Sequence, residues 1–337
     1  AMLKFARAMC VSLLLLFAGA RVSAAEHVFK MATLAPEGST WWKVFKDIDK
    51  RLRELSGGRI EIKLYAGGVA GDEADVIRKM RVGQIQAAAV TSVGLGEIQQ
   101  ALLVLQAPGL FRTWGELDHV REKLATRLAA FLDEKGFVTL LWGDVGFSQM
   151  FSAKPVRVPA DLKATRPWCW TQDGVYQAYF SSLGVKAVSV GVPDVLPGLQ
   201  TDLLDAFSTA PLAAVSLQWF TRAKYMLDLP LTATIGAVIV TKKSLEPLSP
   251  ADREIVMQVS REFAPRLAKV VRQDNETSVG AIKKAGIQVV TPDAAAIAAW
   301  DAAGKKGADA AVGKVYSAEL LAEVRKVLAE YRASGGK

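Results

Sequence analysis

The chain has 337 residues, of which 51% are hydrophobic and 23% are charged, and its formal net charge is +8. Such a composition is typical of a folded chain with about two domains, and it excludes an intrinsically disordered protein. Nucleic-acid binding is disfavoured as well. Basic and acidic residues alternate, as they do along residues 43–53, where a nucleic-acid-binding protein would cluster its Lys and Arg.

Residues 1–25 have the pattern of a secretory signal peptide. Lys4 and Arg7 precede an apolar stretch at residues 11–18, which is too short to span a bilayer. Small residues at 23–25 then offer a cleavage site. We therefore expect a mature chain that starts near Glu26, has only a mild basic excess and is secreted to the periplasm.

Hydrophobic residues in the first half recur with the periods of alternating strands and helices. Ser39 is a predicted N-cap, and Gly57-Gly58 is a predicted helix stop. Strands are predicted at residues 27–33, 59–65, 86–90 and 137–142, and helices at residues 41–56, 72–82 and 114–134.

A second α/β unit follows, and then a very long helix. Strands are predicted at residues 149–152, 165–170, 186–190, 204–208, 232–241 and 287–290. Helices are predicted at residues 175–183, 193–201, 211–219, 250–285, 294–307 and 317–333. Two such units predict two lobes around a cleft. The cleft should receive the loops that follow the strands, after Thr33, Tyr65, Val90, Trp142, Trp170 and Ser208.

The sequence contains no motif typical of an enzyme active site or a cofactor-binding site. The Gly-rich loop at residues 66–71 lacks the Lys-Ser/Thr pair of a phosphate-binding loop, so it is interpreted as a structural turn. His27 and His119 have no nucleophile or metal-ligand partner at a useful spacing. We expect no cofactor, no metal site and a buried, inert Cys169. A secreted hydrolase is kept as the rival class.

Three segments in order carry a family resemblance: residues 65–69 leading to Gly83, residues 159–163, and residues 199–201 leading to Asp205. They resemble the DctP-type solute-binding proteins of TRAP transporters. The resemblance implies an α/β class II periplasmic-binding-protein fold, with two lobes and a long hinge-spanning helix. It also implies delivery of a solute to TRAP membrane subunits. The expected lobes are residues 26–148 with 232–268, and residues 149–231 with 269–337.

One position departs from the family pattern. The usual motif is Asp-Leu-Lys-Gly-Leu-Lys-Ile-Arg, whose Arg holds the carboxylate of the solute. Counted from Asp161, that Arg position falls on Trp168, and Arg166 lies two residues earlier. Trp168 and Trp170 share one face of the predicted strand. If the register slips, Arg166 becomes the carboxylate ligand.

Two further family positions also carry aromatic and hydroxyl residues in place of charged and amide groups, at residues 146–148 and 206–211. This pattern resembles the TPAT subgroup, which pairs with a tetratricopeptide-repeat protein. It favours a hydrophobic or amphipathic, lipid-like ligand. Two alternatives stay open: a small organic carboxylate bound through Arg166, and a periplasmic lipid chaperone without a transporter. The candidate ligand-binding residues are Trp168, Trp170, Phe207, Thr209, Pro211, Trp142, Phe147, Ser148, Tyr65 and Trp41.

Overall fold

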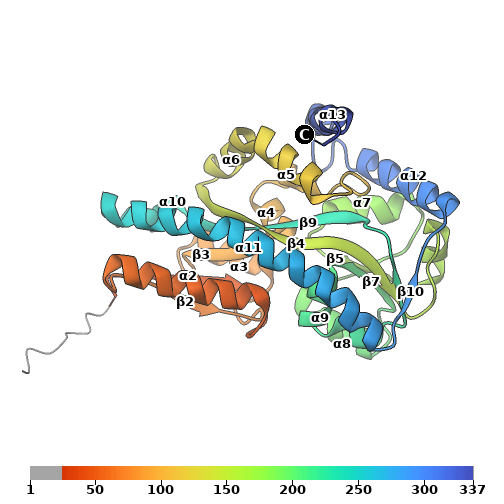
Figure 1. The fold of residues 1–337 in the computed structure, drawn as a ribbon, viewed down its shortest axis with the longest axis horizontal. Helices are drawn as coiled ribbons and strands as arrows, with labels where there is room; N and C mark the ends of the chain where they lie inside the picture. The colour runs from red at the N-terminus through yellow and green to blue at the C-terminus, as the bar shows by residue number, and fades with distance from the viewer. Residues whose placement is uncertain (1–24, 337) are drawn as a thin grey trace, which may run out of the picture.

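The computed structural model describes residues 25–336 and shows a mixed α/β fold (Figure 1). All of the predicted signal peptide except Ala25 lies outside these residues, so it stays a prediction. Within the described part of the chain, no helix is both long enough and apolar enough to cross a membrane.

The first lobe is built from three parallel strands and the helices between them. These elements are β1 (His27–Thr33), α2 (Thr40–Ser56), β2 (Ile60–Tyr65), α3 (Glu73–Arg81), β3 (Ala87–Thr91) and α4 (Ser92–Ile98). Strand β1 pairs in parallel with β2 and with β3. The predicted cap is confirmed, because the Ser39 side chain accepts a hydrogen bond from the Trp42 backbone N–H. Gly57 closes the same helix in the left-handed conformation, which glycine adopts without steric cost.

Two long strands connect the lobes. Strand β4 (Phe137–Ser152) runs for 16 residues and pairs antiparallel with β9 (Thr232–Thr241) over most of its length. The prediction of two separate strands at residues 137–142 and 149–152 was wrong. The glycine-containing segment between them does not form a turn. It continues the strand, with bulges where the pairing with β9 shifts register.

The second lobe contains shorter strands and helices. They are β5 (Trp168–Trp170), α7 (Gly174–Ser182), β6 (Val188–Val190), α8 (Val192–Gln200), β7 (Ala206–Thr209), α9 (Pro211–Ser216), β8 (Tyr225–Leu227) and β10 (Gln288–Val290). Strands β7 and β8 pair with the end of β4, and β5 pairs only with β6. Two short 3-10 helices, η2 (Pro159–Ala164) and η3 (Trp219–Arg222), complete this lobe.

Helix α11 (Pro250–Lys284) is 35 residues long and lies along both lobes, against α2, β4 and α9 (Figure 1). This confirms the long helical prediction. The predicted helix at residues 114–134 is instead two helices, α5 (Trp114–Lys123) and α6 (Ala125–Asp133), because the chain turns at Leu124.

Two C-terminal helices cover the edge of the molecule. Helix α12 (Ala294–Ala310) packs on α7, whereas α13 (Ala318–Ala333) packs on α5 and on η1 (Gln100–Gln106). An ion pair of 2.7 Å between Arg332 and Glu116 fastens α13 to the end of α5. The predicted lobe boundaries remain a proposal, and the contacts of α13 with α5 favour placing α13 with the first lobe.

Candidate functional site

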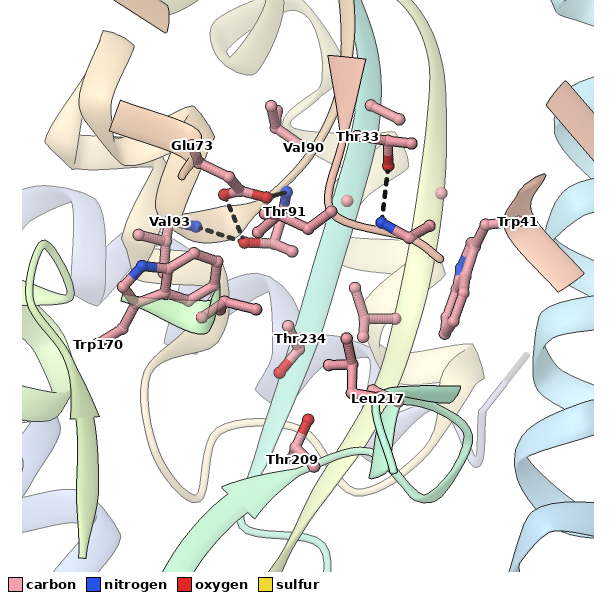
Figure 2. Close-up of a pocket in the computed structure, with 18 of the residues that line it drawn as sticks. Thr33, Trp41, Glu73, Val90, Thr91, Val93, Trp170, Thr209, Leu217 and Thr234 are labelled. Atoms are coloured by element: carbon pink, nitrogen blue, oxygen red, sulfur yellow. Dashed lines mark hydrogen bonds between the residues drawn. The ribbon is translucent and has the colours of Figure 1, made fainter. Parts of the chain in front are cut away.

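A cavity of about 160 Å³ lies between the two lobes, where strand ends of both meet β4 and β9. Its lining residues come from the loop after β1, from α2 and β3 of the first lobe, and from β5, β7 and α9 of the second. Figure 2 shows Trp41 and Trp170 on opposite sides of this space, with Thr209 and Thr234 between them. The cavity therefore occupies the cleft that the strand order predicts.

Aromatic rings form much of the wall. Trp168 packs edge-on against Trp219 at 5.0 Å between ring centroids, and it lies 5.9 Å from Trp170. Trp168 donates its indole N–H to the Val190 carbonyl at 3.0 Å, and Trp41 donates its indole N–H to a backbone carbonyl of β4 at 3.1 Å. Since these N–H groups already have protein acceptors, the rings offer the cavity apolar surface rather than hydrogen bonds.

Hydroxyl groups form the polar part of the lining. The Ser148 hydroxyl lies 2.8 Å from that of Thr234, and the Thr209 hydroxyl points toward Thr234 (Figure 2). Within residues 25–336, the Thr209 hydroxyl has no hydrogen-bond partner. This part of the cavity can therefore donate hydrogen bonds to an acceptor on a bound molecule.

Three buried acidic residues line the cavity, Glu73, Asp144 and Asp173, and burial raises the pKa of Glu73 and of Asp173. Glu73 accepts hydrogen bonds from the Thr91 N–H at 2.7 Å and the Thr91 hydroxyl at 2.9 Å (Figure 2). It also accepts a bond of 2.6 Å from the Gly94 N–H. Burial nevertheless raises the pKa of Glu73 to about 8. Asp173 caps α7 through the Tyr176 N–H and accepts a bond of 2.5 Å from the Gln106 side chain. Burial raises its pKa to about 6.

The raised pKa of Asp173 makes stability depend on pH. Between an unfolded pKa near 3.8 and a folded pKa of about 6, the folded chain holds the proton more tightly, so stability falls as pH rises. The shift corresponds to about 3 kcal/mol of unfolding free energy, lost by pH 7. Glu73 also has a raised pKa and lowers stability over the same pH range in both proteins. In urea titrations from pH 4 to 7, the wild type should therefore lose about 3 kcal/mol more than Asp173→Asn, which keeps the helix cap. Parallel curves for the two proteins would contradict it.

No cation faces the cavity. Among the lining residues of the described chain, none is Lys or Arg. Arg166 does not line it: its side chain is 52% exposed, forms an ion pair of 3.1 Å with Asp205, and donates to the Asp202 carbonyl. The Arg166 side chain pairs with Asp205 outside the cavity, so of this alternative only the small organic carboxylate is retained.

Half of the predicted ligand-binding residues line the cavity, namely Trp168, Trp170, Thr209, Ser148 and Trp41. The other five do not. Phe207 is core, stacked on Phe151 at 5.0 Å, and Pro211 is buried in the first turn of α9. Trp142, Phe147 and Tyr65 pack against the core of the first lobe. The reason for Trp142 is that β4 continues past it, so it is not at a strand end.

Sequence reasoning missed several lining residues. Trp219 and Glu73 line the cavity, although neither is among the candidate ligand-binding residues. Trp219 reaches the cavity because η3 folds back beneath β5, a contact that no local pattern indicates. The buried Cys169 was predicted correctly.

Comparison with known families decides the identity of the fold and its general role. The sequence model of the DctP family, described as bacterial extracellular solute-binding protein family 7, matches residues 31–313. The chain belongs to the DctP family of TRAP solute-binding proteins. Among curated relatives of this DctP protein is the 2,3-diketo-L-gulonate-binding periplasmic protein YiaO of Escherichia coli. It is 25% identical over 288 residues, which cover 85% of this chain and 86% of YiaO.

A second relative is the sialic acid-binding periplasmic protein SiaP of Vibrio cholerae, 22% identical over 84% of this DctP chain and 88% of SiaP. Two solved structures show the same fold. A TRAP periplasmic solute-binding protein of Ralstonia eutropha with bound (S)-2-acetolactate has a TM-score of 0.84 at 23% identity, covering 90% of this chain and 99% of that one. The galactonate complex of a sugar acid binding protein of Advenella mimigardefordensis has a TM-score of 0.85 at 16% identity, covering 91% and 99%.

Proposed function

We propose that this DctP protein binds a small organic monocarboxylic acid with an apolar body in the interlobe cavity and delivers it to TRAP membrane subunits. The observation that carries the proposal is the cavity itself. It combines aromatic walls with the hydroxyls of Ser148, Thr209 and Thr234, and no Lys or Arg of residues 25–336 lines it. A binding role, without catalysis, is proposed because the described relatives are binders of solutes.

Size argues against the lipid-like ligand that the aromatic substitutions first favoured. The cavity is about 160 Å³, and a cavity of about 150 Å³ in another protein holds a molecule the size of benzene. Such a volume suits a small acid better than a long acyl chain. The solved relatives carry (S)-2-acetolactate and galactonate, which are small acids. We therefore set aside the lipid ligand, the lipid chaperone and the tetratricopeptide-repeat partner.

The chemistry of the lining favours one carboxylate and disfavours two. Hydrogen bonds from uncharged donors stabilise a carboxylate, and the Ser148, Thr209 and Thr234 hydroxyls are grouped for that role. These hydroxyls can serve one carboxylate. No Lys or Arg of the described chain lines the cavity, so a second carboxylate would lack both a cation and this group of donors, and its desolvation would cost several kcal/mol. Trp168 replaces the Arg that the family pattern leads us to expect, so we place the apolar body of the acid against this ring.

Two independent observations favour a periplasmic location for the protein. YiaO and SiaP are periplasmic, and the sequence predicts a signal peptide at residues 1–25. We propose the periplasm as the compartment in which the solute is captured.

A calorimetric panel tests the proposal. We expect small monocarboxylates with branched or cyclic bodies, such as pantoate and pyroglutamate, to bind, and succinate and palmitate not to bind. Thr209→Val should weaken the best acid about 10- to 100-fold, because a hydrogen bond to a charged group contributes about 1.5–3 kcal/mol.

Thr139→Val is the matched control. The Thr139 hydroxyl is buried, has no hydrogen-bond partner among residues 25–336 and lies away from the cavity. Its affinity should equal that of the wild type. Tight binding of palmitate, or tighter binding of succinate than of any monocarboxylate, would overturn the proposed ligand class.

A further inference from the structure

Asp72 lies where one helix from each lobe begins. It is the N-cap of α3 in the first lobe, where its carboxylate accepts a bond of 2.9 Å from the Glu73 N–H. Its second oxygen accepts a bond of 2.8 Å from the indole N–H of Trp170, which belongs to β5 in the second lobe. One carboxylate thus caps its own helix and reaches across the cleft to a ring of the cavity wall.

The same carboxylate meets the start of α8 in the second lobe. The N-cap of α8 is Gly191, which has no side chain to offer the first turn. A Cβ at Gly191 would lie 2.6 Å from the Asp72 carboxylate oxygen. The φ of Gly191 is −72°, a value that any residue adopts, so glycine is required here for the approach of Asp72 rather than for backbone freedom.

The N-termini of α3 and α8 favour a negatively charged carboxylate at Asp72. Helix N-termini carry partial positive charge, and those of α3 and α8 both face the Asp72 carboxylate. Burial raises the pKa of Asp72, and the Trp170 indole, the Glu73 N–H and the Val192 N–H oppose that rise by hydrogen bonding to the charged form. The group is therefore partly withdrawn from water and held by donors from both lobes.

A second interlobe contact lies beside the first. A Cβ at Gly68, in the Gly-rich loop after β2, would lie 3.7 Å from the Pro193 ring in α8. Gly68 has a φ of +77°, which a side chain would strain. The glycine loop and Gly191 together let the two lobes come into contact at Asp72.

We propose that Asp72 is a positioning residue that holds the two lobes in contact and fixes the Trp170 ring as a wall of the cavity. Closure of the lobes and assembly of this wall depend on the same hydrogen bond. This contact between the lobes does not depend on which solute the cavity holds, so its loss would leave the proposed ligand class unchanged.

Two substitutions separate this bridge from the helix cap. Asp72→Ser keeps an oxygen that caps α3, but its side chain is too short to reach Trp170. Gly191→Ala keeps the aspartate at position 72, but the added methyl group would displace its carboxylate from the start of α8. Asp75→Ser is the control, because Asp75 lies on the same helix turn and pairs with Arg78 of its own helix.

The readout is the distance between spin labels on cysteines introduced at Val82 and Leu203, which are exposed positions in the first and second lobes. In purified protein, Asp72→Ser and Gly191→Ala should each shift the distance distribution to longer values, and Asp75→Ser should match the unsubstituted labelled protein. The Trp170 indole N–H resonance, assigned by its loss in Trp170→Phe, should move upfield in both bridge variants. Distributions and resonance unchanged in both folded variants would overturn the proposal.

Discussion

Asp144→Ala is expected to lower the free energy of unfolding by about 3–5 kcal/mol, because it leaves two arginines without their buried partner. The Asp144 side chain is fully buried within a bulge of β4. It pairs with Arg121 of α5 at 2.9 Å and with Arg272 of α11 at 2.8 Å. Asp118 closes the network by pairing with both arginines. Urea denaturation followed by tryptophan fluorescence measures the change.

A matched control removes an exposed ion pair in place of a buried one. Asp47→Ala removes an aspartate that pairs with Arg266 on the surface, where both side chains are about half exposed. Exposed ion pairs contribute about 0–1 kcal/mol, so this variant should unfold almost as the wild type does. A loss below 1 kcal/mol in Asp144→Ala would contradict the claim that this network fastens α11 to the strand that joins the lobes.

Trp168→Ala is expected to weaken binding of the best monocarboxylate roughly 30- to 150-fold. The indole is 8% exposed and borders the cavity, and removal of one buried aromatic contact costs about 2–3 kcal/mol. Calorimetric titration of the variant with the acid that binds the wild type most tightly measures the effect.

Trp300→Ala provides the control for stability. Trp300 is 2% exposed in the core of the second lobe, and its indole also donates to a backbone carbonyl, at 2.9 Å. It does not line the cavity. Both Trp variants should lose stability, but only Trp168→Ala should lose affinity. Equal affinities in Trp168→Ala and the wild type would show that the acid does not contact this ring.

The outline of the fold could be predicted from local patterns. The alternation of residues 27–33, the N-cap at Ser39 and the stop at Gly57 each act within a few residues of sequence, and all were confirmed. Strand β4 was misjudged because its glycines indicate a turn in isolation. Continuous pairing with β9, which lies about 90 residues later, keeps them in a strand.

The site could be predicted only in part, for a related reason. Trp168 and Trp170 share a strand face, so period two and the family register were enough to place them together. Phe207 belongs to a strand of four residues that is buried on both faces. The alternation of its side chains therefore could not show which face borders the cavity. Arg166 lies close to Trp168 in sequence but faces the opposite way, toward Asp205.

The most direct test of the central claim is the electron density in the cleft of a crystal grown with the acid that binds most tightly in the panel. We expect one small monocarboxylate, with its carboxylate at the Thr209 and Thr234 hydroxyls and its apolar body against Trp168 and Trp170. A carboxylate paired with Arg166, or an acid bound outside the cleft, would contradict the account.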